Sequence, residues 1–286
     1  MKKLFVVLTV CAAMVVGVMP AHASKGEVTL VYTEWACATA STHVLKATLE
    51  QAGYDVETLP VTAAAIYQSL ATGNADAMTT AWLPITHADY MKKVGDDVVN
   101  LGTNLNGPAV LGWVVPAYVD IDSIPEMKDP KIADKFNNKI IGIDPGAGLM
   151  RYSEKALKAY DLEDEYELME GSGATMTAAL SNGIKDNEWV VVTGWAPHWK
   201  FGRWDLKILE DPKKELGEVE RVDTIVRKGL KEDMPEAYAI IDRFEWDEKD
   251  IAQVMDWNTA DNADPDETAK KWVAQNQDKV NKWLGK

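Results

Sequence analysis

Three tryptophans occupy positions at which an indole ring could bind a ligand: Trp35, Trp82 and Trp195. Each follows the end of a predicted strand, where α/β folds bind their ligands. The chain has 11 Trp in 286 residues, and most of them are expected to pack in the core or against a helix face. The recurrence of these three at equivalent strand ends favours a shared ligand site.

Three indole faces turned toward one space would form a box with negative π surface on every side. Such a box suits a quaternary ammonium ion, which is cationic but donates no strong N–H hydrogen bond. At roughly 1–2 kcal/mol for each desolvated face, three rings supply about 3–6 kcal/mol. Micromolar affinity needs roughly 8 kcal/mol, so burial of the methyl groups and a polar anchor must supply the rest.

The predicted anchor is the glycine-rich turn 144–148, Asp-Pro-Gly-Ala-Gly, between a predicted strand and a helix. The N–H groups of Gly148 and Leu149 would be free at the helix start, where the helix dipole favours an anion. The turn lacks the glycine spacing of a dinucleotide site or a P-loop, and it could also be a simple connection. His87, five residues after Trp82, could donate to a carboxylate held by those two N–H groups.

Catalytic and metal-dependent functions find little support in the sequence. It contains no G-x-S-x-G or H-E-x-x-H motif, and no Cys–His pairing near Cys37. His43 and His198 are expected to be structural hydrogen-bonding residues. We therefore expect no catalytic residue, no metal and no cofactor. An enzyme acting on a methylated amine and a structural or adhesive exported protein are the alternatives from other classes.

The elements that must position these residues occur twice in the same order. Both copies alternate strands with helices and end in Trp-x-Pro, with a His soon after, and this pattern predicts parallel sheets covered by helices. The first copy has strands at 28–32, 56–59 and 75–81 and helices at 42–52 and 63–71; the second has strands at 139–143, 166–169 and 189–193 and helices at 149–160 and 174–180.

The segments between and after the copies predict connections between two lobes. Residues 108–118 have the pattern of a strand that crosses to the second copy, and residues 222–226 that of a strand that returns. The acidic C-terminal segment has a helical pattern. We expect a two-lobed α/β body with a cleft between the lobes as its site: lobe I comprises 24–110 plus 222–286, and lobe II comprises 111–221.

The N-terminal residues predict export. A Lys2-Lys3 pair, an apolar run and an A-x-A site at 21–23 predict a cleavable signal peptide over 1–23. An acylated Cys11 is disfavoured, because Val10 is bulky for the position before it. The net charge of −15 argues against nucleic acid or an anionic membrane surface as partner. We expect a periplasmic protein.

With these motifs in place, the chain resembles the substrate-binding proteins of glycine betaine ABC importers, the OpuAC/ProX-like family of type II periplasmic binding proteins. The resemblance implies a two-lobed, Venus-flytrap fold. It implies that Trp35, Trp82 and Trp195 surround a trimethylammonium group, and that His87 and the N–H groups of Gly148 and Leu149 hold the carboxylate. The matching segments are Thr33-Glu34-Trp35, 65–71, 81–90, 143–149 and 194–199.

The expected function is that of a non-enzymatic, monomeric receptor that closes around glycine betaine and delivers it to a permease–ATPase complex in the inner membrane. Choline, carnitine, proline betaine, dimethylsulfoniopropionate and trimethylamine N-oxide are alternative ligands of the same fold. Glu34, directly before Trp35, departs from the family pattern. It would favour a net cation such as choline if it faced the cleft, and we expect it to point outward.

Overall fold

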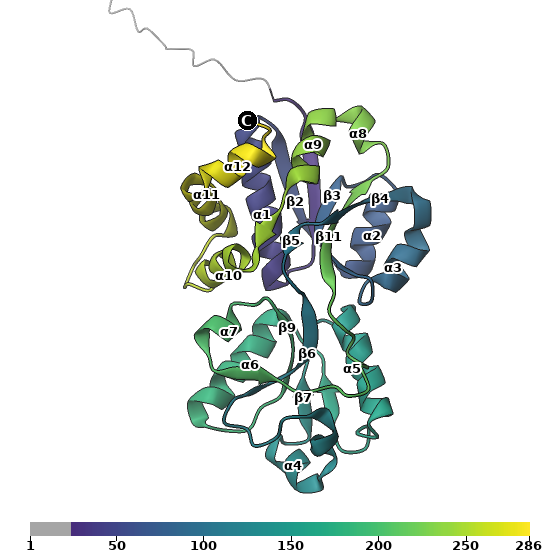
Figure 1. The fold of residues 1–286 in the computed structure, drawn as a ribbon, viewed down its shortest axis with the longest axis vertical. Coiled ribbons are helices and arrows are strands. Elements are labelled where there is room, and N and C mark those ends of the chain that lie inside the picture. Colours follow the sequence, from purple (N-terminus) through teal and green to yellow (C-terminus); the bar gives the residue numbers. More distant parts are fainter. Residues whose placement is uncertain (1–23) are drawn as a thin grey trace, which may run out of the picture.

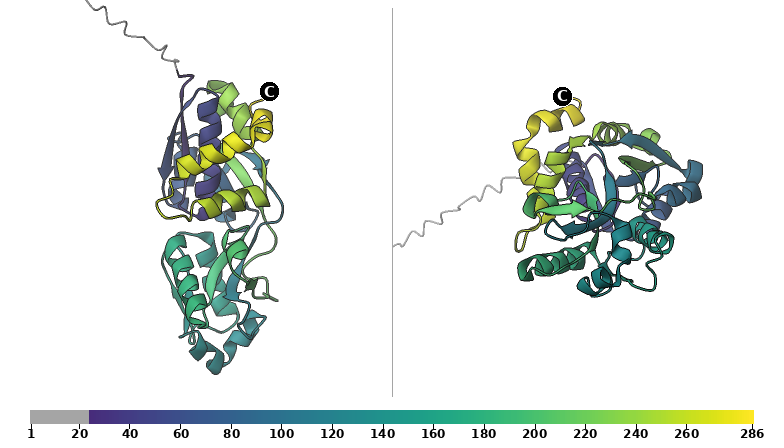
Figure 2. Two further views of the ribbon diagram at one scale, coloured as in Figure 1. Left: turned by 90° about the vertical axis from the view of Figure 1, so that its left-hand side faces the viewer. Right: turned by 60° about the horizontal axis from the view of Figure 1, so that its bottom comes forward.

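The computed structural model describes residues 24–286; the predicted signal peptide, 1–23, lies outside them. The described residues form two five-stranded sheets and one two-stranded sheet. The two large sheets and their helices form two bodies, one above the other, in an elongated molecule (Figure 1). We call them the β1 lobe and the β9 lobe, after one strand of each. A view from the side shows the same division (Figure 2).

The sheet of the β1 lobe has the strand order β2-β1-β3-β11-β4. Strands β1, β2 and β3 are parallel, and β11 is antiparallel to both β3 and β4. Every residue of β3 is buried, as expected of a central strand covered on both faces. The strands are β1 (Glu27–Tyr32), β2 (Asp55–Pro60), β3 (Ala77–Leu83), β4 (Val98–Thr103) and β11 (Arg221–Arg227).

The sheet of the β9 lobe repeats this plan in the order β8-β7-β9-β6-β10. Strand β7 is parallel to β8 and β9, whereas β6 is antiparallel to β9 and β10. The prediction of parallel sheets is therefore wrong at one inner strand of each sheet, and both sheets are mixed. The strands are β6 (Val110–Pro116), β7 (Lys139–Ile141), β8 (Glu167–Met169), β9 (Val192–Ala196) and β10 (Leu206–Ile208).

Helices cover both faces of the sheet in the β1 lobe (Figure 1). Helix α1 packs against the C-terminal helices on one face, while α2 and α3 contact each other on the other face. A short 3-10 turn, η1 (Gly95–Asp97), follows α3, and a two-stranded sheet pairs β5 with β12. The elements are α1 (Ala36–Gln51), α2 (Ala63–Ala71), α3 (Ala88–Val94), α8 (Leu230–Asp233), α9 (Pro235–Arg243), α10 (Glu248–Trp257), α11 (Pro265–Gln275), α12 (Gln277–Trp283), β5 (Leu105–Asn106) and β12 (Trp246–Asp247).

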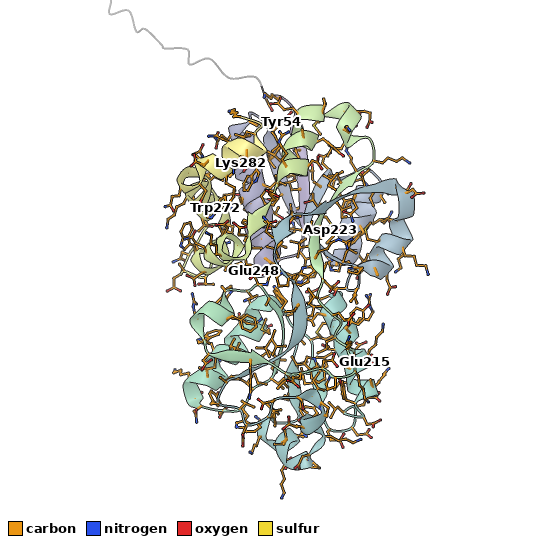
Figure 3. The ribbon with its side chains drawn as sticks, viewed as in Figure 1. Tyr54, Glu215, Asp223, Glu248, Trp272 and Lys282 are labelled. Atoms are coloured by element: carbon orange, nitrogen blue, oxygen red, sulfur yellow. The ribbon has the colours of Figure 1, made fainter. Side chains whose placement is uncertain are left out.

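Four of the eight remaining tryptophans are buried in the core and the other four are partly buried against it, in line with the packing role that the sequence predicts. Trp246, Trp272 and Trp283 are buried, and their neighbouring ring centroids are 6.0 and 5.8 Å apart. Trp272 lies among the C-terminal helices in Figure 3. Trp113 is buried in the β9 lobe. Trp189 is half-buried and precedes β9 instead of opening it.

The helices of the β9 lobe lie on both sides of its sheet, with α5 on one side and α6 and α7 on the other (Figure 1). No helix among residues 24–286 combines the length and the apolar character that a membrane span needs. The helices of this lobe are η2 (Ile124–Lys128), α4 (Pro130–Lys135), α5 (Gly148–Ala159), α6 (Gly173–Asp186) and α7 (Lys200–Arg203).

Two chain segments cross between the lobes, one entering β6 and one entering β11. They are joined at the crossing by two backbone hydrogen bonds between Ala109 and Glu220, with N–O distances of 3.0 and 2.7 Å. The two crossings therefore lie side by side between the two large sheets.

Candidate ligand-binding site

One cavity between the lobes is lined by all six residues that the sequence predicts for the ligand site. Its empty volume is about 310 Å³, within the size range of small-molecule sites. The indoles are almost fully buried, with exposed fractions of 6%, 4% and 3% for Trp35, Trp82 and Trp195. The two lobes are therefore closed over the cavity in this structure.

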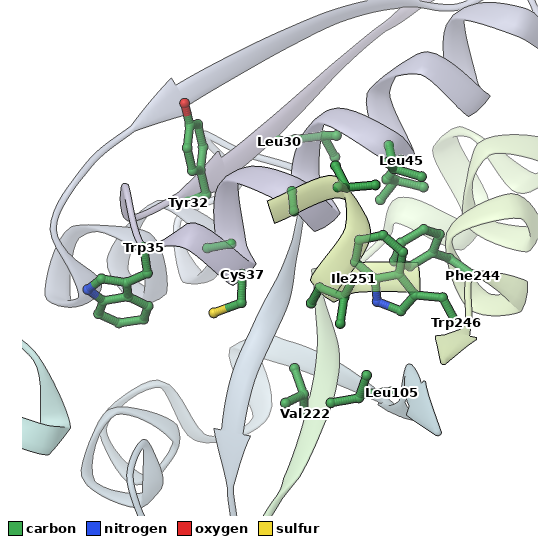
Figure 4. Packing of buried hydrophobic residues seen from close by; sticks show 14 of the residues in the cluster. Leu30, Tyr32, Trp35, Cys37, Leu45, Leu105, Val222, Phe244, Trp246 and Ile251 are labelled. Atoms are coloured by element: carbon green, nitrogen blue, oxygen red, sulfur yellow. The ribbon is translucent and has the colours of Figure 1, made fainter. Parts of the chain in front are cut away.

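The three indoles come from the ends of strands in both lobes. Trp35 follows β1 and is the N-cap residue of α1, and Trp82 is the penultimate residue of β3. Trp195 lies in β9, where it pairs with Leu111 of β6. Figure 4 shows Trp35 and Cys37 at the start of α1, beside the hydrophobic core of the β1 lobe. The β1 lobe thus supplies two rings and the β9 lobe the third.

His87 presents a neutral imidazole to the cavity. Its Nδ1 accepts a hydrogen bond from the Trp82 backbone N–H at 3.2 Å and lies 3.1 Å from the Tyr67 hydroxyl. Burial, with a smaller effect from Arg151, lowers the pKa of His87 to about 3. Since Nδ1 is an acceptor and the ring is neutral, the proton is on Nε2. Nε2–H has no partner among the described residues and is free to donate to a ligand.

The start of α5 supplies two further donors. Gly148 and Leu149 are its first two residues, and the N-cap residue Ala147 makes no side-chain cap. Their N–H groups have no acceptor within residues 24–286, which is the usual state of the first N–H groups of a helix. A Cβ atom on Gly148 would lie 2.5 Å from Cγ2 of Thr86. Glycine thus allows the helix start to approach the β1 lobe closely.

Direct contacts hold the two lobes together beside the cavity. The Tyr90 hydroxyl of α3 donates to the carbonyl of Gly146 at 2.8 Å. Arg151 of α5 donates from Nη2 to the carbonyl of Thr86 at 3.0 Å. The Glu220 carboxylate at the crossing accepts the Thr86 backbone N–H at 2.8 Å. The loop that follows β3 is therefore held by Glu220 of the crossing segment and by Arg151 of α5.

The other residues considered from the sequence lie outside the cavity. Glu34 is exposed and does not line it, which confirms the outward orientation. Nδ1 of His43 lies 2.6 Å from Oδ1 of Asp266, and Nδ1 of His198 accepts the Lys200 backbone N–H at 3.2 Å. Both histidines are structural, as predicted.

Sequence reasoning missed five residues of the cavity wall: Cys37, Thr86, Leu111, Ile143 and Ala147. Four of them adjoin or nearly adjoin a predicted site residue or turn, so proximity along the chain was the available signal. Leu111 carries no such signal, because its pairing with Trp195 depends on the antiparallel β6. Burial raises the pKa of Cys37 to about 12, so its side chain is a neutral thiol. Residues 24–286 hold no cluster of three or more potential metal ligands.

Two curated relatives share part of this sequence. The chain is 48% identical over 153 residues to the glycine betaine/carnitine transport binding protein GbuC of Listeria monocytogenes, with 53% of this chain and 51% of the relative covered. It is 28% identical over 204 residues to the glycine betaine/proline betaine-binding periplasmic protein of Salmonella typhimurium, with 65% and 61% covered. The matches span between half and two thirds of the length of these relatives.

Two solved structures are similar over nearly the whole chain. Lactococcal OpuAC, in its closed-liganded conformation with glycine betaine, has a TM-score of 0.84 and 42% identity, with 91% of this chain and 99% of that chain covered. The glycine betaine, L-proline ABC transporter binding protein ProX of Borrelia burgdorferi has a TM-score of 0.86 and 41% identity, with 90% and 96% covered. These similarities establish the two-lobed periplasmic-binding-protein fold.

A family model described as the substrate binding domain of ABC-type glycine betaine transport systems, OpuAC, matches residues 26–275. This range contains both large sheets, the crossing segments and every residue of the cavity wall. The chain belongs to the OpuAC family of substrate-binding domains.

Proposed function

We propose that this protein is the extracytoplasmic solute-binding receptor of an ABC importer and that it binds glycine betaine in the cavity between the lobes. One observation carries the proposal: three indoles and three unpaired N–H donors, contributed by both lobes, line the same cavity. This combination matches a ligand with a methylated cation at one end and a carboxylate at the other. The protein acts by binding and release and performs no chemical reaction.

The indoles of Trp35, Trp82 and Trp195 would surround the trimethylammonium group. A quaternary ammonium cannot donate an N–H hydrogen bond, so ring quadrupoles and burial of its methyl groups provide its favourable contacts. The Trp35 indole N–H donates to the Asp144 carboxylate at 2.7 Å. That bond orients the ring and brings a negative charge near the cation.

The carboxylate would accept hydrogen bonds from His87 Nε2–H and from the N–H groups of Gly148 and Leu149. The positive end of the α5 dipole favours an anion at this position. A neutral imidazole donates a hydrogen bond without adding a cation next to the trimethylammonium group. The anchor thus binds the anionic end and leaves the cationic end to the indoles.

Binding would be coupled to hinge closure. The ligand contacts Trp35, Trp82 and His87 on one lobe and Trp195, Gly148 and Leu149 on the other, so it stabilises the closed form relative to the open one. We place the hinge at the Ala109–Glu220 bridge, between the predicted lobes 24–110 plus 222–286 and 111–221. The closed, liganded monomer would deliver its solute to a permease–ATPase complex in the inner membrane, after export to the periplasm under the signal peptide 1–23.

Related solutes are the nearest alternatives: choline, carnitine, proline betaine, dimethylsulfoniopropionate and trimethylamine N-oxide. The unpaired N–H donors favour a ligand with a carboxylate over choline, which has a hydroxyl group there. Glu34 is exposed and lies outside the cavity, so it places no carboxylate beside the ligand, where it would have favoured a net cation.

The test is to identify the solute that the protein carries. Protein purified under native conditions is denatured, and the released small molecules are identified by mass spectrometry; unfolded and refolded protein is then titrated by calorimetry with the six solutes. Glycine betaine should be recovered and should bind most tightly, with micromolar affinity or better. Recovery of a different solute that binds more tightly would replace the ligand, and no binding of any of the six would contradict the receptor function.

A further inference from the structure

A lysine without a partner is buried behind the cavity wall. Lys200, the first residue of α7, is 0% exposed, and its Nζ makes no hydrogen bond to the described residues. Nζ lies over the Trp195 ring, 4.9 Å from the centroid. Lys200 does not line the cavity, whereas Trp195 does. The indole therefore separates the amine from the ligand space.

The groups around Lys200 do not neutralise its charge. No ion pair within residues 24–286 includes Lys200, and the titratable group whose field acts on it is Cys37 of α1. Burial keeps Cys37 a thiol, and it lowers the pKa of His198 well below its usual value, so both are neutral. Arg203, at the end of α7, pairs with Asp256 at 2.6 Å on the surface. Burial lowers the pKa of Lys200 to about 7, so the amine gains or loses its charge near neutral pH.

Resting on the proposed function, we propose that Lys200 is a specificity-determining residue that rejects ligands with a net positive charge. A protonated amine behind Trp195 repels the quaternary ammonium in front of it. A zwitterion offsets this repulsion, because its carboxylate is attracted by the same charge from only a few ångströms further away. A ligand with no carboxylate has no such compensation. The discrimination depends on ligand net charge and needs no contact between Lys200 and the ligand.

Coulomb's law sets the scale of the effect. With the ligand nitrogen about twice as far from Nζ as the 4.9 Å to the ring centroid, and with an effective dielectric constant of about 20, a net cation should bind roughly 10- to 30-fold more weakly when Lys200 is charged. For a zwitterion the same estimate gives about a twofold change. Selectivity for zwitterions should therefore be high below pH 7 and should decrease as the amine loses its proton.

The test compares glycine betaine with betainamide, in which a carboxamide replaces the carboxylate and the net charge becomes positive. Neither ligand titrates between pH 6 and 9. Calorimetry at pH 6 and at pH 9 gives the ratio of the dissociation constant of betainamide to that of glycine betaine. The ratio is measured for the wild type and for two variants. Lys200→Met keeps a long buried side chain, and Lys185→Met removes an exposed lysine of α6 as a control. Because bound betainamide itself promotes loss of the Lys200 proton at pH 6, the ratio should fall about fourfold from pH 6 to pH 9 in the wild type and in Lys185→Met. In Lys200→Met it should be low at both pH values.

The outcomes separate this inference from the proposed function. If glycine betaine binds but the wild-type ratio is the same at pH 6 and pH 9, or if Lys200→Met rejects betainamide as strongly as the wild type, the role of Lys200 is wrong and the receptor function stands. If glycine betaine does not bind the wild type at all, the proposed function itself fails. A wild-type ratio that does not change with pH overturns the role of Lys200 by itself, so the proposal can be refuted even if the variant does not fold.

Discussion

The indole N–H of Trp35 donates a hydrogen bond to the Asp144 carboxylate, with 2.7 Å between Nε1 and Oδ2. Trp35 follows β1 in the β1 lobe, and Asp144 belongs to the glycine-rich turn after β7 in the β9 lobe. The bond therefore exists only when the lobes are closed. It also fixes one wall of the indole box, so it couples the geometry of the site to closure.

Asp144→Asn should weaken both ligand binding and closure. The variant keeps the shape of the side chain and an acceptor oxygen but loses the charge, so a hydrogen bond of about 1.5–3 kcal/mol becomes a neutral one of about 0.5–1.5 kcal/mol. We expect glycine betaine affinity to fall roughly 5- to 10-fold by calorimetry. Asp120→Asn, which removes an exposed charge elsewhere in the β9 lobe, is the control. Wild-type affinity in Asp144→Asn would show that this bond does not support the bound state.

Gly148→Ala should hold the lobes apart. The added Cβ would lie 2.5 Å from Cγ2 and 2.6 Å from the carbonyl oxygen of Thr86, closer than packed atoms approach. We expect at least a tenfold loss of glycine betaine affinity and a larger radius of gyration by small-angle X-ray scattering at saturating ligand. Gly173→Ala is a matched control, because Gly173 is also the first residue of a helix and a Cβ there meets nothing within 4 Å. Equal behaviour of the two variants would contradict the tight approach at Gly148.

The neutral, buried His87 predicts a loss of stability in acid. Its pKa is about 3 in the folded protein against 6.5 for an unperturbed histidine. Between these values the unfolded chain binds a proton that the folded protein does not, so this contribution to the free energy of unfolding falls as pH falls from about 6.5 to 3. At pH 5 the loss relative to pH 7 should be about 2 kcal/mol.

Urea unfolding of the wild type and His87→Gln at pH 5 and pH 7 measures this effect. The variant lacks the titrating ring, so the difference between the two proteins isolates His87 from the other histidines. Parallel stability curves for the two proteins would mean that His87 takes up a proton as readily in the folded protein as in the unfolded chain.

Sequence patterns locate most elements of this fold because apolar spacing and glycines mark them. Helix α2 has the predicted bounds, 63–71, and β1 and β2 are within one residue of theirs at each end. Helix α1 begins six residues before the predicted 42, because its first turns are built from small residues that lack an amphipathic pattern. Strand direction is not encoded in the alternation of side chains. The antiparallel β6 and β11 could therefore be predicted as strands but not oriented.

The sequence predicts those site residues whose side chains have a distinctive chemical role, such as aromatic rings and a histidine. It does not predict the residues that only shape the cavity wall. Trp35, Trp82, Trp195 and His87 stand out by type and spacing, and all of them line the cavity. Small and aliphatic wall residues have no such signature. For Lys200 the residue type is misleading, because a lysine is expected at the surface. Its burial follows only from the packing of α7 behind Trp195.

The central claim is that indoles from both lobes bind the positive charge of a methylated ammonium. Calorimetry with glycine betaine and with 3,3-dimethylbutanoate, in which carbon replaces the ammonium nitrogen, tests it most directly because shape and carboxylate are the same. Glycine betaine should bind about 100-fold more tightly or better, and Trp195→Ala should reduce this ratio by about tenfold. Equal binding of the two ligands to the wild type, or a ratio that Trp195→Ala leaves unchanged, would contradict the claim.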